Sequence, residues 1–141
     1  MSTLESLLYI SSARPGLSDA DFAALLASSE RNNARRGLTG ALLKYGTRFV
    51  QMLEGPGEAL DTCFAKIAAD ARHAEVRVVQ RAPVTERRFG RWSMRNVPIE
   101  SGSDKVVDAF LGALGSDQPD AATVARAIEL LAALARRAPP A

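Results

Sequence analysis

The sequence has a single cysteine and a single histidine among its 141 residues, and both scarcities exclude kinds of chemistry. One thiol, Cys63, makes neither an internal disulfide nor a cysteine metal cluster, and no ligand spacing typical of a metal site occurs. No run approaches about eighteen uninterrupted apolar residues, and no basic segment precedes an apolar one at the N-terminus. We therefore expect a cytoplasmic protein without metal that is neither secreted nor membrane-spanning.

The sequence also lacks a large excess of basic over acidic residues or of acidic over basic ones. The 18 Lys and Arg residues are spread among 16 Asp and Glu residues, and the net charge is +2. No basic surface typical of nucleic-acid binding stands out, so we expect no nucleic-acid partner. Apolar residues make up 47% of the chain and charged residues 24%, which fits one globular unit with its own core.

The spacing of apolar residues predicts alternating strands and helices. The expected strands, in chain order, cover 4–11, 39–44, 48–54, 76–84 and 92–97. The expected helices cover 19–33, 58–71, 106–114 and 122–137. The order βαββαββ predicts an α+β, ferredoxin-like fold in which two helices cover one face of a five-stranded mixed sheet. We expect residues 1–98 to form this domain and residues 99–141 to add C-terminal helices to the same globular unit.

Polar residues on faces that ought to be apolar are the candidate functional positions. Gln51 shares its strand face with two large apolar neighbours, and Tyr9 and Ser11 share a face of the first strand. Asn32 and Asn33 close the first helix, where at least one amide can point back toward the sheet. An unpaired buried polar group costs about 1–3 kcal/mol, so each of these needs a partner. The side chains either satisfy one another in a core or line a binding site.

The second helix carries the other polar pattern. Lys66, Asp70 and His73 are separated by steps of four and three, which puts them on one stripe if the helix runs that far. The stripe borders the apolar residues Phe64 and Ile67. It is either an ordinary solvated helix face or the charged rim of a cleft between the two helices, with amides at its floor.

Five short motifs occur in order between about residues 4 and 97. They are LLYIS at 7–11, RNN at 31–33 with GLTG at 37–40, FVQMLEG at 49–55, DARH at 70–73 and WSM at 92–94. Together they resemble the BLUF domains, a family of flavin-based blue-light sensors. The resemblance covers roughly two thirds of the chain.

The resemblance implies a flavin, as FAD, FMN or riboflavin, held without a covalent bond between the two helices. The implied cofactor contacts are Tyr9, Leu25, Asn32, Asn33, Gln51, Lys66, Ile67, Asp70, Arg72 and His73. Gln51, Tyr9 and Asn33 would contact the pyrimidine edge of the ring. The charged residues and His73 would contact the rim of the ring, the ribityl hydroxyls or the phosphate. Leu25 and Ile67 would pack against the dimethylbenzene side. Where this chain has Lys66 the family more often has Arg, whose planar fork binds a carbonyl differently from an ammonium.

The resemblance also implies how such a chain responds to light. Tyr9 would donate an electron and a proton, and Gln51 would relay them and then rotate or tautomerise, which shifts flavin absorption slightly to the red. Ser11, Trp92 and Met94 complete the implied photoactive set. Because Trp92 and Met94 share one face of the expected fifth strand, either can contact Gln51 and carry the change to the C-terminal helices.

The expected output is a signal rather than a product. We expect no enzyme activity and a downstream effector protein that is contacted in trans. The last helix carries an apolar stripe of Val124, Ile128, Leu131 and Leu134. We expect this stripe to pack on the open face of the sheet, and a homodimer or higher homo-oligomer through the same region, or a partner protein there, stays open.

Two other functions are compatible with a ferredoxin-like fold. An enzyme of this fold would use His73 as a base, or arginines to bind an acyl phosphate, but no Ser or Cys has an identifiable catalytic partner. An RNA-binding module would use a patch of Arg77, Arg81, Arg87, Arg88, Arg91 and Arg95. The stacking aromatics that such a sheet needs are missing from its strands, which leaves the light sensor as the favoured interpretation.

Overall fold

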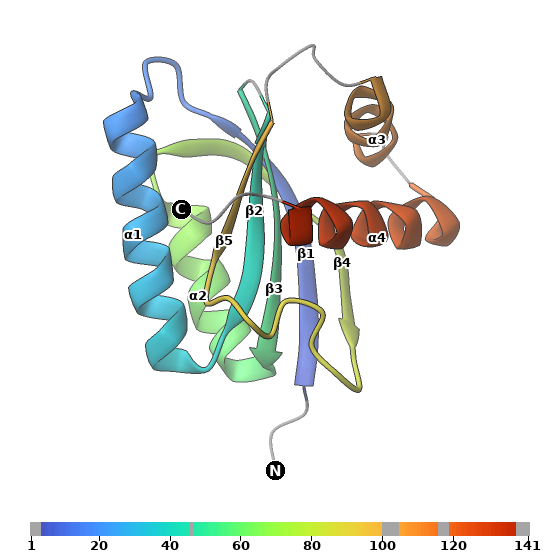
Figure 1. The fold of residues 1–141 in the computed structure, drawn as a ribbon. Coiled ribbons are helices and arrows are strands. Elements are labelled where there is room, and N and C mark those ends of the chain that lie inside the picture. The colour runs from blue at the N-terminus through green and yellow to red at the C-terminus, as the bar shows by residue number, and fades with distance from the viewer. Residues whose placement is uncertain (1–3, 46, 100–104, 116–118, 138–141) are drawn as a thin grey trace.

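The computed structural model describes residues 4–45, 47–99, 105–115 and 119–137, which form one sheet with helices on both of its faces (Figure 1). Its strands are β1 (Leu4–Ala13), β2 (Thr39–Tyr45), β3 (Arg48–Pro56), β4 (His73–Pro83) and β5 (Arg95–Ile99). Its helices are α1 (Asp19–Arg36), α2 (Gly57–Ala69), α3 (Lys105–Leu114) and α4 (Ala121–Arg137). None of the helices in these ranges has the length and apolarity needed to cross a membrane.

The sheet has the strand order β4-β1-β3-β2-β5, with β3 in the middle. Strand β1 runs antiparallel to both β3 and β4, β2 runs antiparallel to β3, and β2 pairs with β5 in parallel. The sheet is therefore mixed, and the expected α+β ferredoxin-like fold with five strands is confirmed. The register places Tyr9 directly opposite Gln51, and Gln51 directly opposite Leu42.

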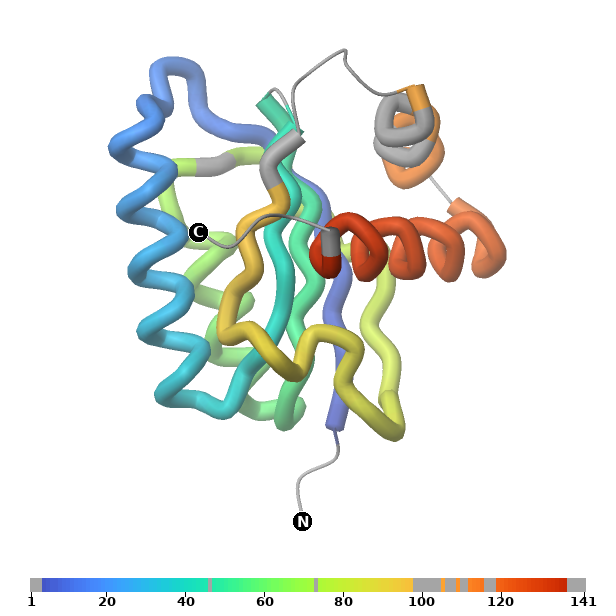
Figure 2. Tube along the Cα trace, viewed as in Figure 1, coloured from blue at the N-terminus to red at the C-terminus, as the bar shows by residue number. Residues whose placement is uncertain are grey.

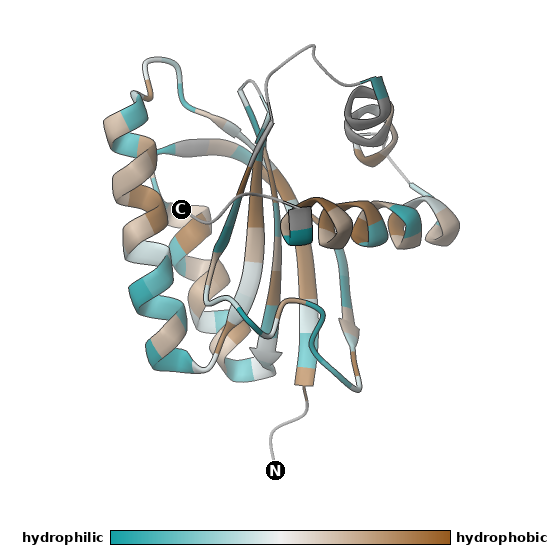
Figure 3. Cartoon of the chain, in the orientation of Figure 1, coloured by the Kyte–Doolittle hydropathy of each residue, from teal (hydrophilic) through white to brown (hydrophobic). Residues whose placement is uncertain are grey.

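The period of two along the strands divides the core into two clusters. One cluster, which includes Leu7, Leu42, Phe49 and Leu53, packs against α1 and α2. We call it the cleft-side cluster, because a cleft described below opens on this face of the sheet. The other cluster, which we call the α4-side cluster, lies on the opposite face. It includes Leu8 of β1, Leu43 of β2, Val50 of β3 and Leu131 of α4. Figure 3 shows apolar colouring along the middle of the strands and hydrophilic patches on α1. The middle strands β1, β2 and β3 are thus buried on both of their faces, whereas the edge strand β4 is more exposed.

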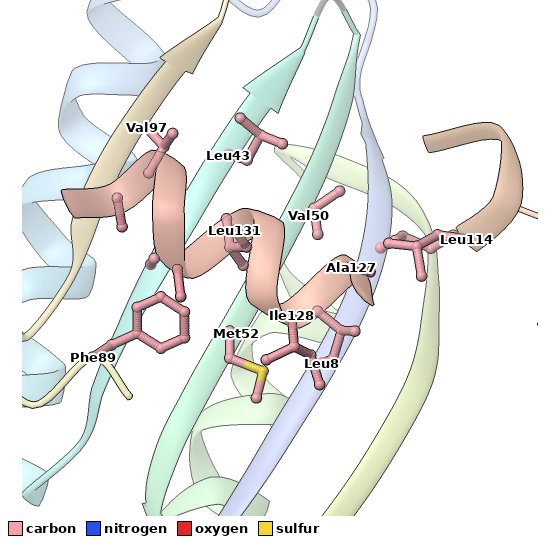
Figure 4. Packing of buried hydrophobic residues seen from close by; sticks show 14 of the residues in the cluster. Leu8, Leu43, Val50, Met52, Phe89, Val97, Leu114, Ala127, Ile128 and Leu131 are labelled. Carbon is pink, nitrogen blue, oxygen red and sulfur yellow. The ribbon is translucent and has the colours of Figure 1, made fainter. Parts of the chain in front are cut away.

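Helix α4 lies across the sheet, as Figure 4 shows for Leu131 and Ile128 above Val50, Met52 and Leu8. Leu8, Val50 and Leu131 are almost completely buried. Burying a side chain of this size contributes about 1.5–3 kcal/mol. The prediction that the last helix packs on the open face of the sheet is confirmed.

Local sequence signals set the ends of α1. Ser18 caps the first turn, since its side chain accepts a hydrogen bond from the Asp21 N–H while the Asp21 carboxylate accepts one from the Ser18 N–H. Gly37 ends the helix in the left-handed region, with φ of 73°. The helix runs three residues beyond the predicted end, so Asn33 lies within its last turn, where it is buried.

A stretch of irregular chain connects the two edges of the sheet. We name residues 84–94 the crossing segment, because they run from the end of β4 to the start of β5 on the opposite edge (Figure 2). The last strand, expected over 92–97, starts and ends later, since β5 begins at Arg95, continues to Ile99 and pairs Pro98 with Lys44 of β2. An edge strand tolerates proline because one side of its backbone needs no hydrogen-bond donor.

Candidate functional site

A cleft opens between α1 and α2 above the middle strands, and its empty space, counted out to the open solvent, is about 690 Å³. Nine of the ten predicted cofactor contacts line it: Tyr9, Leu25, Asn32, Asn33, Gln51, Lys66, Ile67, Asp70 and Arg72. The tenth, His73, is the first residue of β4, and its side chain lies outside the described part of the chain. The fold therefore gathers residues from four distant stretches of sequence into one cleft.

Tyr9 and Gln51 form the floor of the cleft. They are opposite each other on antiparallel strands, where Cβ atoms lie about 4.5–5.5 Å apart, so their side chains are cross-strand neighbours. Both side chains are almost completely buried. The edge of the Tyr9 ring also packs against Phe64 of α2, with ring centroids 5.7 Å apart. The floor is therefore a buried surface with two polar side chains in it.

The surroundings of Tyr9 keep its phenol protonated. Burial raises the pKa of Tyr9 well above its usual value, and the nearby Cys63 thiol and Asp70 carboxyl raise that pKa further. An ionised phenol in this place would lose its hydration without gaining a cation. Tyr9 therefore holds a proton that it can donate to an acceptor in the cleft.

The Gln51 amide contacts a weak partner. Its Nε2 donates to the Sδ atom of Met94 at 3.4 Å, and a thioether is a weak acceptor. A buried amide ordinarily finds stronger partners, because leaving its groups poorly paired costs free energy. The amide nitrogen of Gln51 is therefore held by a weak hydrogen bond.

Asn33 joins three elements. Its Nδ2 donates to the backbone carbonyl of Ser93 at 2.7 Å, and its Oδ1 accepts from the Cys63 thiol of α2 at 3.8 Å. Asn32 points to the rim of the cleft, where its Oδ1 accepts a hydrogen bond from Arg35. Of the two amides near the end of α1, Asn33 is thus the buried one, and it joins α1 to α2 and to the crossing segment.

The charged rim differs from the predicted helical stripe. Helix α2 ends at Ala69, and the Asp70 carboxylate accepts hydrogen bonds from the Arg72 N–H at 2.9 Å and from its guanidinium at 2.6 Å. This local side-chain bond competes with another helical turn, so the prediction that Lys66, Asp70 and His73 form one helical stripe is wrong. Lys66 and Asp70 still meet at the cleft, together with Arg72.

The prediction that Trp92 and Met94 share one face of a strand is also wrong. Strand β5 begins at Arg95, and the three preceding residues bend around the end of β2, where the Trp92 carbonyl accepts from the Gly40 N–H. Trp92 packs against the α4-side cluster, whereas Met94 belongs to the cleft-side cluster. Met94 is therefore the neighbour of Gln51.

Ser11, the remaining predicted photoactive residue, is buried opposite Phe49 of β3. It is not among the residues that line the cleft. The structure thus places Tyr9, Gln51 and Met94 together, and Trp92 against the cluster on the other face of the sheet. No group of three or more potential metal ligands occurs in the described ranges.

Comparison with known proteins decides the family. The family model described as "BLUF: Sensors of blue-light using FAD" matches residues 4–95. The chain belongs to the BLUF family. A BLUF domain is a sensor module, and the cofactor by which the family is defined is FAD, as the sequence resemblance implies.

Similar proteins carry the BLUF domain in different contexts. Over 100 residues, the chain is 39% identical to the photoactivated adenylate cyclase subunit beta of Euglena longa. The match covers 70% of this chain and 12% of that protein, and the corresponding subunit of Euglena gracilis is 37% identical with the same coverage. The chain thus spans about an eighth of the length of these curated relatives.

Solved structures agree with the BLUF assignment. The dark-state structure of BlrB, a BLUF protein, is 37% identical with a TM-score of 0.74, and the match covers 92% of this chain and 98% of that one. The photo-activated state of BlsA superposes with a TM-score of 0.78 at 23% identity, which shows the shared fold. The likeness to BlrB extends beyond residues 4–95 into the C-terminal helices.

The BLUF cleft contains residues that the sequence prediction did not include. These are Ser28, Ser29, Arg36, Leu42, Phe49 and Cys63. Phe49 shares a strand face with Gln51, and Arg36 follows Asn33 by three residues, so periodicity could have found both. Cys63 lies one helical turn from Ile67 on the face of α2 that looks into the cleft. As the only thiol in the chain, it is also a chemical probe of this BLUF cleft.

We expect Cys63 to react slowly with iodoacetamide in the folded chain near neutral pH. Burial raises the pKa of this thiol, and the cations Arg36 and Lys66 offset only part of that rise. Because a raised pKa leaves less thiolate at a given pH, labelling of the folded chain should accelerate at a higher pH than labelling of the denatured chain. Mass spectrometry of the labelled fraction across pH measures this, and equal rates for both states would contradict it.

Proposed function

We propose that this chain is a blue-light photoreceptor that holds a flavin without a covalent bond and signals by rearranging hydrogen bonds rather than by turning over a substrate. One observation carries the proposal: the buried Gln51 amide lies beside the Tyr9 phenol at the floor of the cleft, and it donates to the Met94 thioether. A buried amide with so weak a partner is suited to switching between two arrangements.

The residues of the cleft fit a flavin ring. Gln51 and Asn33 offer amide donors and acceptors to a polar edge, while Leu25 and Ile67 offer apolar contact to the remainder of a flat heterocycle. Arg72 at the rim suits ribityl hydroxyls or a phosphate. We propose FAD as the cofactor, with FMN or riboflavin able to fill the same ring site.

Lys66 departs from the arginine that is more frequent in the family. It lies at the exposed mouth of the cleft, where an ammonium binds an anionic or carbonyl oxygen as a point charge rather than as a fork. We propose that Lys66, Asp70, Arg72 and His73 serve the rim and the ribityl chain, and that Asn32 assists from α1. In this proposal the flavin makes its tightest contacts with Tyr9 and Gln51 at the buried floor of the cleft.

The mechanism follows from the neighbours of Gln51. When a bound flavin absorbs blue light, it supplies a strong oxidant at the floor of the cleft. Tyr9 gives up an electron and its phenolic proton and then regains both, so no net chemistry remains on the tyrosine. Gln51 relays that proton and settles with its amide rotated or tautomerised. The lasting difference is a new set of hydrogen bonds around Gln51, which shifts absorption slightly to the red.

We propose that this change leaves the cleft through Met94 and reaches the helices that follow β5. Two contacts support this route: Arg95 donates to the Ala135 carbonyl near the end of α4, and Arg88 forms an ion pair with Glu129 of α4. In this proposal residues 1–98 form the sensing unit and residues 99–141 the output element. The signal then passes to an effector protein in trans in the cytoplasm, either from a single chain or from a homo-oligomer.

The colour of the protein tests the proposal. Protein purified in the dark should be yellow with the absorption bands of an oxidised flavin. Brief blue illumination should move these bands to longer wavelength, and darkness should restore them. A colourless preparation that also takes up no added flavin would refute the proposal, as would a flavin-bound protein whose spectrum does not respond to light.

A further inference from the structure

We propose that Glu54 is a positioning residue of the light response, because its buried carboxylate holds the crossing segment and thereby sets the place of Met94 beside Gln51. The inference rests on the proposed function and deepens it. Glu54 is outside the cleft, so it touches neither Gln51 nor a cofactor. Its expected role is to control how fast the light-induced state returns to the dark state.

Glu54 is a charged side chain only 1% exposed. It lies on the face of β3 opposite to Gln51, because the two residues are three positions apart on one strand. Its carboxylate accepts hydrogen bonds from the N–H groups of Arg88 and Phe89, at 2.7 Å and 2.8 Å. The Thr39 hydroxyl donates a third, at 3.3 Å. The acid is thus fully engaged in holding backbone of the crossing segment.

Arg87 adds a second attachment at the same place. Its guanidinium donates to the carbonyls of Gly37 and Glu54, at 2.8 Å and 3.0 Å, and to the Thr39 hydroxyl at 2.9 Å. These acceptors belong to the end of α1 and to strands β2 and β3. The first half of the crossing segment is therefore tied to the elements that frame the cleft.

The second half of the crossing segment reaches the cleft itself. Phe89, completely buried, belongs to the α4-side cluster, while Met94 accepts from Gln51 in the cleft. Between them the carbonyls of Trp92 and Ser93 accept from the Gly40 N–H and the Asn33 amide. The segment thus passes from one face of the sheet to the other within six residues, 89–94. The attachment at Glu54 and the position of Met94 therefore belong to one short, tethered stretch of chain.

The attachment needs a carboxylate of this length. Two backbone N–H donors face its two oxygens, and a glutamine would present an NH₂ group to one of them. Glu54→Gln keeps the size of the side chain but replaces one hydrogen bond with a clash of two donors. The crossing segment is then held less firmly in the position that brings Met94 back to Gln51.

Recovery in the dark after a blue flash tests the proposal. Glu54→Gln should bind flavin and show the same red shift, but its return to the dark spectrum should slow by roughly tenfold, the factor expected for one lost buried hydrogen bond. The emission of Trp92, the only tryptophan, reports movement of the segment independently of the flavin. Its light-induced change should decay with the same slowed rate. Glu86→Gln, an exposed change of equal charge in the same segment, should recover as the unmodified chain does.

A second measurement separates positioning from plain destabilisation. If Glu54 acts through Met94, then the effect of Glu54→Gln on the recovery rate should vanish in a Met94→Ala background. A merely structural role predicts the same slowing in both backgrounds and would overturn the proposal. Should Glu54→Gln fail to fold, Thr39→Val removes one donor to the carboxylate and one acceptor of Arg87, which loosens the same attachment, and should slow recovery by about twofold.

The outcomes also distinguish this inference from the proposed function. A chain that responds to light but recovers at the same rate with and without Glu54→Gln or Thr39→Val overturns the positioning role alone. An unmodified chain without any light response overturns the proposed function and the positioning role together. A slowed recovery that depends on Met94 supports both.

Discussion

Replacing Gln51 by leucine should leave flavin in the cleft and abolish the light-induced red shift. The two side chains are similar in size, and the apolar neighbours Phe49 and Leu53 on the same strand face accommodate leucine. Removing a poorly paired polar group from such a face costs little stability. Leucine can neither donate nor accept a hydrogen bond, so the two arrangements that light would exchange no longer exist.

Difference absorption spectra before and after blue light measure the Gln51→Leu effect. Gln80→Leu is the matched control, because Gln80 is opposite Leu8 on β4 and does not line the cleft. The control should keep both the flavin and the shift. If Gln51→Leu still shows a full and reversible red shift, Gln51 is not the switching group, and the mechanism proposed for this chain is wrong.

Replacing Tyr9 by phenylalanine should retain the flavin and remove the reversible light response. Tyr9 is buried beside Gln51, and its raised pKa keeps the proton on the phenol until it is needed. Phenylalanine fills nearly the same volume and keeps the edge contact with Phe64, so the fold should persist. Without the hydroxyl, the floor of the cleft has no phenolic electron and proton to give.

The second tyrosine provides an internal control. Tyr45, the only other tyrosine, belongs to the α4-side cluster on the far face of the sheet. Tyr45→Phe should respond to light as the unmodified chain does. Transient absorption after a blue pulse should detect the loss in Tyr9→Phe, and an unchanged yield of the red-shifted state in that variant would assign the donor role to another group.

Periodicity predicted the floor of the cleft because strands impose a strict alternation. The positions of Phe49, Gln51 and Leu53 on one face follow from the period of two alone, and the register then adds Tyr9. Helical spacing likewise predicted that at least one of Asn32 and Asn33 points inward from α1, and the structure shows that Asn33 is the buried one. These residues depend on regular elements, which is why the prediction succeeded for them.

The predictions failed where side chains override regular structure. The helical spacing of α2 does not predict that the Asp70 carboxylate accepts a hydrogen bond from the Arg72 N–H, two residues further along the chain. This hydrogen bond competes with another helical turn. The alternation of Trp92, Ser93 and Met94 similarly suggests a strand, but the chain bends there to reach both faces of the sheet. Only the tertiary contacts with Gly40 and Asn33 determine that bend.

The position of β3 restricts how any signal can leave the cleft. This middle strand is hydrogen-bonded along its length to β1 on one side and to β2 on the other. The backbone at residue 51 is therefore held on both sides by hydrogen bonds. The Gln51 side chain can rotate more easily than this backbone can move. A light response of the proposed kind would therefore have to pass through side chains and the crossing segment, by rotation about a few bonds rather than by bending of the sheet.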